Sequence, residues 1–108
     1  MSGISTHVLD IALGKPAANV PIKLERLESG GWVELTSTVT NADGRCDALL
    51  PRDDVTPGEY RLTFKTVAYQ TISIYTEVAV SFAVTQGSIN YHLPLLLSPF
   101  GYTTYRGS

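Results

Sequence analysis

His7 and His92, the two histidines of the chain, are the side chains best suited to acid–base chemistry. Each lies in an otherwise apolar, strand-like segment. An imidazole changes its charge near neutral pH, so a neutral ring could take a proton from a water molecule. A histidine in such a segment could equally be structural and hydrogen-bond a neighbour. The sequence alone does not show that the two rings meet.

Other chemistries fit these residues less well. A zinc site needs three or four ligands, and the chain has one cysteine and no His-x-His or His-Glu-x-x-His pair. Asp10 or Asp43 could in principle complete a site, but we do not expect a metal. Ser108, His92 and Asp10 could form a triad, but no serine lies in a Gly-x-Ser-x-Gly elbow. Cys46 has no evident base to activate it, and we interpret it as a small strand residue. Hydrolysis by an activated water is the simpler hypothesis.

Arg45 directly follows the segment Asn41–Gly44, which begins with Asn and ends with Gly as a type I turn does. Such an arginine could be an ordinary solvated turn residue. Alternatively, its planar guanidinium could bind an anionic, carbonyl-rich molecule.

The last eighteen residues contain a strand-like run, a Pro/Gly turn and a second strand-like run that reaches the end of the chain. Chain termini are usually polar and poorly ordered. This one contains His92 and finishes with Tyr105-Arg106-Gly107-Ser108. We therefore expect the C-terminus to take part in function, with Arg106 in a supporting role beside the terminal carboxylate.

Alternation of apolar and polar residues with a period of two predicts strands along most of the chain. We expect eight of them, at 4–12, 20–25, 32–39, 45–50, 60–65, 78–84, 91–97 and 102–106. Many short strands separated by turns are typical of a β-sandwich, so the predicted fold class is all-β. Pro94 lies inside a strand expected to be central, which indicates a bulge or a special site there.

The length of 108 residues suits a single domain over 1–108. A net charge of −2 without a Lys/Arg cluster argues against nucleic acid or an anionic membrane as a partner. No apolar run approaches the roughly 20 residues of a membrane span. The lone cysteine excludes an intrachain disulfide, and Met1-Ser2-Gly3 leads directly into a strand pattern, so we expect no signal peptide and a cytoplasmic location.

Three motifs resemble the 5-hydroxyisourate hydrolases of the transthyretin-related family. They are Ser5-Thr6-His7-Val8-Leu9-Asp10 with Gly14-Lys15-Pro16-Ala17, then the segment 40–46, and the terminal Tyr105-Arg106-Gly107-Ser108. This last tetrapeptide separates the hydrolases from the hormone carrier transthyretin. The three motifs occur in the family's order and span the whole chain.

The resemblance implies a transthyretin-like two-sheet β-sandwich with one short helix, which we place at 67–75, although the β-branched residues there favour a strand. The first, fourth, seventh and eighth predicted strands would share one sheet. The implied reaction is hydrolysis of 5-hydroxyisourate to 2-oxo-4-hydroxy-4-carboxy-5-ureidoimidazoline in urate degradation, without a cofactor. The implied assembly is a homotetramer, a dimer of dimers, with sites where the dimers meet.

The resemblance also implies the site residues. His7, His92, Arg45 and Ser108 would be catalytic, while the residues expected to bind substrate are His7, Arg45, Tyr105, Arg106 and Ser108. Which histidine is the base stays open. Two rival interpretations are a non-catalytic carrier like transthyretin and a structural sandwich domain of a larger secreted protein.

Overall fold

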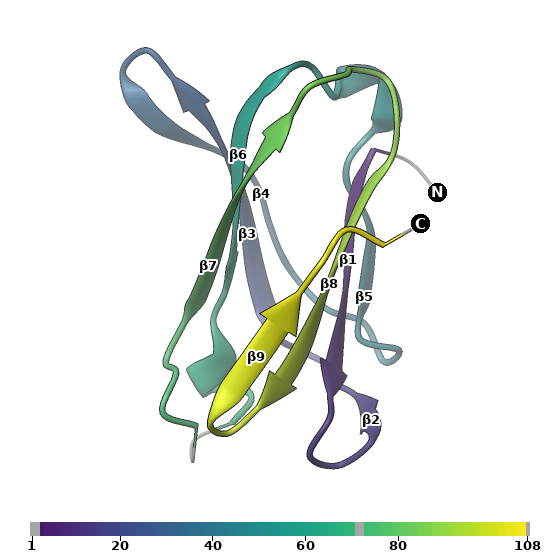
Figure 1. Cartoon of the computed structure of the whole chain (residues 1–108), viewed down its shortest axis with the longest axis vertical. Helices are drawn as coiled ribbons and strands as arrows, with labels where there is room; N and C mark the ends of the chain where they lie inside the picture. The colour runs from purple at the N-terminus through teal and green to yellow at the C-terminus, as the bar shows by residue number, and fades with distance from the viewer. Residues whose placement is uncertain (1–2, 71–72, 108) are drawn as a thin grey trace.

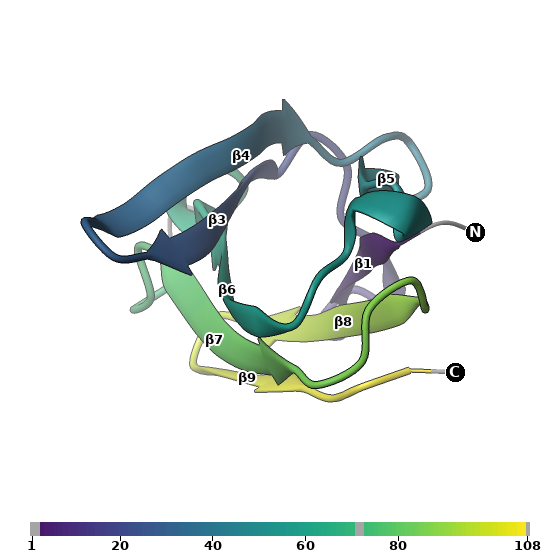
Figure 2. The ribbon, with the colours of Figure 1, turned by 90° about the horizontal axis from the view of Figure 1, so that it is seen from above.

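Two β-sheets lie face to face in the computed structural model, which describes residues 3–70 and 73–107 (Figures 1 and 2). The first sheet contains β1 (Ile4–Asp10), β2 (Lys15–Pro16), β5 (Arg45–Leu50), β8 (Tyr91–Ser98) and β9 (Gly101–Thr104). The second contains β3 (Pro21–Glu28), β4 (Gly31–Val39), β6 (Gly58–Phe64) and β7 (Val78–Val84). The predicted all-β sandwich is confirmed.

Strand β1 is central in the first sheet. It pairs in parallel with β8 on one side and antiparallel with β5 and β2 on the other, and β9 extends the sheet beyond β8. The second sheet has the order β4-β3-β6-β7. The first, fourth, seventh and eighth predicted strands therefore do share one sheet.

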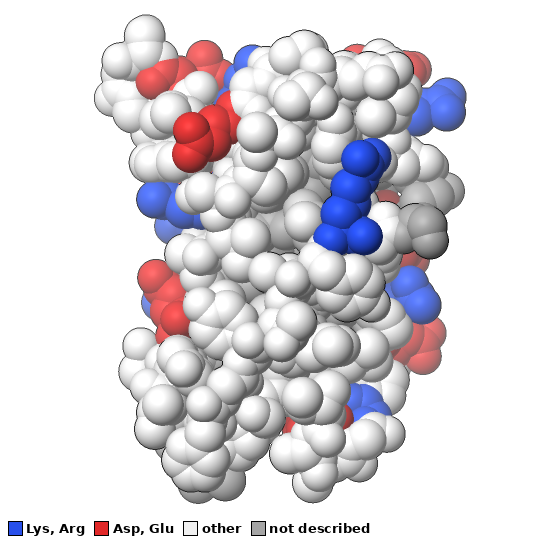
Figure 3. Space-filling model, viewed as in Figure 1, with Lys and Arg blue, Asp and Glu red and all other residues white. Residues whose placement is uncertain are grey.

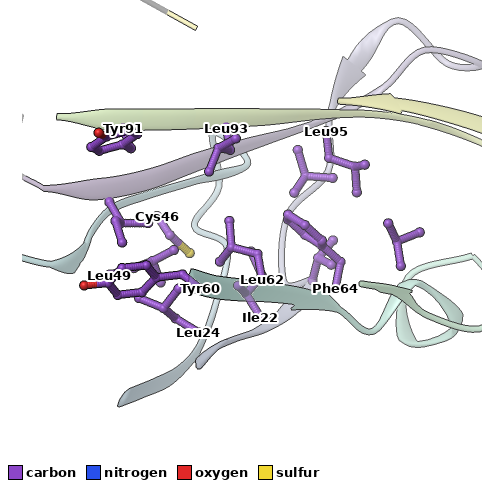
Figure 4. Close-up of a cluster of buried hydrophobic side chains, with 14 of the residues drawn as sticks. Ile22, Leu24, Cys46, Leu49, Tyr60, Leu62, Phe64, Tyr91, Leu93 and Leu95 are labelled. Atoms are coloured by element: carbon purple, nitrogen blue, oxygen red, sulfur yellow. The ribbon is translucent and has the colours of Figure 1, made fainter. Parts of the chain in front are cut away.

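The core lies between the two sheets because each strand alternates apolar residues inward with polar residues outward. In Figure 4, Tyr91, Leu93 and Leu95 of β8 point toward Leu62 and Phe64 of β6. All five side chains are buried, and each contributes roughly 1.5–3 kcal/mol of hydrophobic free energy. The same alternation turns the intervening residues of β8, His92 among them, to the outer face of the sheet.

The ends of the predicted strands needed correction. The first strand ends at Asp10 rather than residue 12, because the Asp10 carboxylate accepts a hydrogen bond from Leu13 N–H at 3.0 Å and its carbonyl accepts one from Gly14 N–H at 2.8 Å. Those bonds turn the chain into β2, a two-residue strand that the alternation did not predict. The last strand, β9, spans 101–104 rather than 102–106.

The prediction of a short helix over 67–75 is wrong for residues 67–70 and 73–75. Residues 71–72 lie outside the part of the chain that the structure describes. One turn of 3₁₀ helix, η2 (Thr66–Ala68), precedes an irregular stretch at 73–77. Thr66 Oγ1 donates to the Tyr75 carbonyl at 2.7 Å, and Val67 N–H donates to the Thr76 carbonyl at 3.1 Å. These bonds close the segment into a loop, and its β-branched residues favour helix poorly. The other 3₁₀ turn of the described chain, η1, is Arg52–Asp54.

Pro94 produces an irregularity, but on one side of β8 only. Its pairing with β1 is unbroken, while the regular ladder to β9 stops at Leu95↔Thr104. Proline has no N–H to donate, and the Pro94 carbonyl instead accepts the Thr104 hydroxyl at 2.7 Å. The chain then continues alongside β8 and meets it again at the single bridge His92↔Gly107 (Figure 1). The special site predicted at Pro94 is thus an interrupted ladder beside His92, with no bulge in β8.

Charged side chains are sparse on the face seen in Figure 3, where Lys and Arg occur singly rather than as a patch. Among residues 3–70 and 73–107, the only helical segments are single 3₁₀ turns, far too short to span a bilayer.

Candidate active site

Three adjacent strands bring His7, Arg45 and His92 to the outer face of the first sheet. His7 of β1 lies directly opposite Arg45 of β5. On the other side of β1, His7 lies opposite Pro94, two residues from His92 on β8. Because alternate residues share a face, all three side chains point the same way. Strand spacing and rise put the Cα atoms of His7 and His92 about 8 Å apart.

The turn before β5 fixes the position of Arg45. The Asn41 side-chain oxygen accepts hydrogen bonds from the backbone N–H groups of Asp43 and Arg45, both at 2.9 Å, and Gly44 N–H closes the turn on the Asn41 carbonyl. Gly44 has φ +75°, and a Cβ there would lie 2.4 Å from the Val8 carbonyl oxygen. Glycine therefore lets the turn dock on β1, next to His7.

The same turn orients His7. Its Nε2 lies 2.9 Å from the Asp43 carbonyl oxygen. A carbonyl only accepts, so Nε2 carries the hydrogen and donates. In the neutral ring the lone pair is then on Nδ1, which becomes the nitrogen able to accept a proton or a hydrogen bond.

His92 is held from β1. Its Nδ1 lies 2.9 Å from the hydroxyl of Ser5, a fully buried residue directly opposite it in the parallel register. Burial lowers the pKa of His92, and the positive charges of Arg45 and His7 lower it further, while Asp47 opposes them. These effects favour the neutral ring, and Nε2 is the nitrogen left for chemistry.

The C-terminal segment lies against His92. Gly107 N–H donates to the His92 carbonyl at 2.7 Å. The Arg106 guanidinium instead stacks 4.4 Å from the centre of the Tyr91 ring and donates to the Asn90 carbonyl at 3.2 Å. Arg106 thus ties the segment to the residues just before His92.

Two more predicted residues belong to this end of the chain. The Tyr105 side chain is 51 % exposed, and Ser108 lies outside the described residues. The structure therefore brings together His7, Arg45 and His92, while the roles given to Tyr105, Arg106 and Ser108 stay predictions.

Sequence reasoning missed Ser5 and the backbone of Asp43. Ser5 could have been found, because it lies two residues before His7 and so shares its face of the strand. The Asp43 carbonyl carries no signal in the sequence, because any residue has one. Its importance comes only from the docking of the turn on β1.

The described residues do not support a metal site, a Cys46 nucleophile or a Ser-His-Asp triad. Within residues 3–70 and 73–107 no three His, Cys, Asp or Glu side chains are close enough to hold a metal ion. Burial and Asp47 raise the pKa of Cys46 to about 11, so its thiol stays protonated. The Asp10 carboxylate is buried at the other end of β1, where it accepts the Tyr69 hydroxyl at 2.7 Å. Burial and that bond raise the pKa of Tyr69 to about 12, and Asp10 is not the third member of a triad with His92.

A pocket of about 220 Å³ opens beside Arg45, between β4 and β5. Arg45 and Asp47 line it from β5, with Thr36 and Thr38 from β4. Neither histidine is among its lining residues. We therefore locate the candidate active site on the outer face of the sheet, where both rings lie.

Comparison with known proteins agrees with this arrangement. The family model described as "HIUase/Transthyretin family" matches residues 4–107. A mouse protein named 5-hydroxyisourate hydrolase is 46 % identical over 113 residues, covering 99 % of this chain and 96 % of its own. The structure of Klebsiella pneumoniae 5-hydroxyisourate hydrolase is 38 % identical, with a TM-score of 0.83 and full coverage of both chains.

A transthyretin is also similar in structure. Transthyretin from Sparus aurata is 32 % identical, with a TM-score of 0.90, covering 99 % of this chain and 97 % of its own. The fold is thus shared by hydrolases and a transthyretin, and the fold alone does not distinguish them. Both the family model and the near full-length relatives show that this chain belongs to the HIUase/Transthyretin family.

Proposed function

We propose that this chain hydrolyses 5-hydroxyisourate in urate degradation, the reaction for which its mouse and Klebsiella relatives are named. The observation that carries the proposal is the arrangement of both histidines and Arg45 on one face of one sheet. A neutral base, a second imidazole and a cation are groups that can catalyse hydrolysis of a cyclic amide by water.

His92 is the base in this mechanism. Its burial and the neighbouring Arg45 charge lower its pKa and favour the neutral ring, in which Nε2 has a lone pair available. When Nδ1 carries the hydrogen and donates to the Ser5 hydroxyl, Nε2 takes a proton from water as the water oxygen attacks a ring carbonyl carbon. The protonated His92 then returns that proton to the departing ring nitrogen.

The bonds balance without a cofactor. One C–O bond forms between water and the carbonyl carbon, and the C–N bond of the ring amide breaks. The carbonyl carbon becomes the carboxylate of the product, and the released nitrogen becomes part of its ureido group. The product of this step is 2-oxo-4-hydroxy-4-carboxy-5-ureidoimidazoline.

Arg45 stabilises negative charge in this mechanism. Its backbone is tied to Asn41, and its side chain shares the face of His7, so the guanidinium is available to the substrate anion and to the developing oxyanion. A planar guanidinium can bind an anion through two parallel N–H donors, which the ammonium group of a lysine cannot do.

His7 positions the substrate or the water. With Nε2–H engaged by the Asp43 carbonyl, the neutral ring offers Nδ1 as an acceptor. Tyr105 and Ser108 would also bind the substrate, and Ser108 would hydrogen-bond the substrate or the water. The course of the chain past His92 to Gly107 supports this role of the terminus.

The working form would be a homotetramer, a dimer of dimers, with sites where the dimers meet. The position of β9 at a sheet edge supports this, because an exposed edge strand can pair with another chain. Sedimentation velocity tests it: one tetrameric species is expected, and a stable monomer with full activity would contradict the proposal.

We further propose a single domain over 1–108 and a cytoplasmic location, the latter supported by the lone, buried cysteine.

The deciding experiment follows the ultraviolet absorbance of freshly generated 5-hydroxyisourate with and without the protein. We expect the wild type to accelerate its decay, and His7→Ala and His92→Ala each to lower turnover about a hundredfold or more. The rival is a carrier, because the similar solved structures include a transthyretin in complex with thyroxine. Tight thyroxine binding with no accelerated decay would favour the carrier and refute the hydrolase.

A further inference from the structure

His92 is held along two edges of its ring. In imidazole, Nδ1 and Cδ2 are both bonded to Cγ and lie on opposite edges, and Nε2 is the next atom after Cδ2, toward the tip of the ring. Ser5 Oγ is 2.9 Å from Nδ1. On the other edge, a Cβ built on Gly107 would lie 2.8 Å from Cδ2 of His92 and 3.4 Å from Cγ of Pro94. The backbone of Gly107 therefore occupies the space beside that edge.

Space, rather than backbone freedom, is what requires glycine at 107. Gly107 is absent from the glycines with positive φ, so other residues could adopt its backbone conformation. Its N–H donates to the His92 carbonyl at 2.7 Å, so the segment is fixed against β8 and cannot easily move away. A methyl group there would press on the ring of His92.

The two contacts together fix the ring orientation. Rotating the ring by half a turn about Cβ–Cγ would exchange its edges, removing Nδ1 from Ser5 and placing a carbon against the hydroxyl. Ser5 is itself fully buried in β1, directly opposite His92, so its hydroxyl is a fixed partner. Only one orientation of the ring keeps the hydrogen bond.

We propose that Ser5 and Gly107 are positioning residues that hold the His92 ring with Nδ1–H toward Ser5 and Nε2 toward the reacting water. This inference rests on the proposed function and adds to it the residues that select the working nitrogen. Nε2 can act as a base only when Nδ1 carries the hydrogen, and the Ser5 oxygen is the acceptor for that hydrogen. Gly107 keeps the ring from tilting toward the C-terminal segment.

The first test compares two variants that each lose one buried hydroxyl from neighbouring positions of β1. Ser5→Ala removes the partner of His92. The matched control Thr6→Val removes a hydroxyl that donates to the Leu93 carbonyl at 2.6 Å. A merely structural hydroxyl should lower the melting temperature alone. We expect Ser5→Ala to lower kcat roughly ten- to a hundredfold with KM within about threefold, Ser5→Thr to restore most of kcat, and Thr6→Val to keep it.

The second test uses Gly107→Ala, with Gly101→Ala as its control. At Gly101 the nearest atom to a new Cβ is Ser98 Oγ at 3.9 Å, an ordinary contact. We expect Gly107→Ala to lower kcat at least about tenfold with little change in melting temperature, and Gly101→Ala to keep kcat. This pair decides the proposal even where Ser5→Ala fails to fold.

A third readout does not depend on activity. Nitrogen-15 NMR of the His92 ring distinguishes its two tautomers, and we expect the Nδ1–H form in the wild type and its loss in Ser5→Ala. If the wild type has the Nδ1–H form but does not hydrolyse 5-hydroxyisourate, the proposed function fails while the positioning by Ser5 stands. If Ser5→Ala leaves both the tautomer and kcat unchanged, or Gly107→Ala behaves like Gly101→Ala, the positioning role is wrong.

Discussion

Replacing Gly44 by alanine tests whether the docked turn places the active site. Gly44 has φ +75°, and a Cβ there would lie 2.4 Å from the Val8 carbonyl oxygen and 3.1 Å from Ala17 N. The left-handed backbone alone costs alanine about 1–2 kcal/mol. The collision adds roughly 1–3 kcal/mol, the usual cost of forcing atoms into a packed site. The total is a large part of the roughly 5–15 kcal/mol that keeps a domain folded.

The chain offers a matched control for this variant. Gly14 has φ +69°, but a Cβ there would meet no atom within 4 Å. Gly14→Ala therefore costs only the backbone term, and the difference between the two variants isolates the collision. At roughly 4–8 °C per kcal/mol for a domain of this size, Gly44→Ala should lower the melting temperature by about 4–24 °C more than Gly14→Ala.

Gly44→Ala should also lose more catalytic activity than Gly14→Ala. Pushing the turn off β1 displaces Arg45 and the Asp43 carbonyl that orients His7, and a shift of about 1 Å can cost on the order of a hundredfold in rate. Thermal unfolding and the absorbance decay of 5-hydroxyisourate measure both effects in the same preparations. Equal losses of stability and activity in Gly44→Ala and Gly14→Ala would refute the idea that the contact with β1 positions the site.

Three further variants test other parts of the structure. Tyr69→Phe removes a bond to the buried Asp10 carboxylate and should lower the unfolding free energy by about 1–3 kcal/mol in urea titrations, with activity kept; unchanged stability would contradict this. Arg45→Lys keeps the charge but loses the planar fork, so kcat should fall roughly a hundredfold, and an unchanged kcat/KM would make Arg45 an ordinary turn residue. Deleting residues 106–108 should remove most activity while circular dichroism and the tetramer persist; full turnover by the truncated tetramer would exclude the terminus from the site.

The sequence was most informative where local chemistry decides the structure. Alternation predicted the strands because each sheet buries one face, and Asn41 and Gly44 predicted the turn before β5. The prediction of a helix at 67–75 was wrong because hydrogen bonds from Thr66 and Val67 to later residues close a loop there. Helix or strand propensity cannot predict such bonds. The predicted end of the first strand was wrong for a similar reason: a hydrogen bond from Leu13 N–H to the Asp10 carboxylate turns the chain earlier than the pattern suggests.

The site depended on pairing that no local pattern reveals. Ser5 and His92 face each other across a parallel strand pair although 87 positions separate them in the chain. Resemblance to the hydrolases, rather than spacing, therefore suggested that the two histidines meet. Neither spacing nor resemblance pointed to the ring contacts of Ser5 and Gly107, because these depend on side-chain geometry at the place where Pro94 interrupts the ladder.

The pH dependence of kcat/KM tests the central claim, hydrolysis by neutral His92, most directly. Protonation removes the lone pair on Nε2, so activity must fall as the pH drops through the pKa of His92. Burial and the charge of Arg45 lower that pKa, so the midpoint of the acid limb should lie below the ordinary value of about 6.5. In His92→Gln the rate should collapse and the limb should vanish, with circular dichroism at each pH showing that the protein stays folded. A midpoint above 6.5, or the same limb and rate in His92→Gln, would contradict the mechanism.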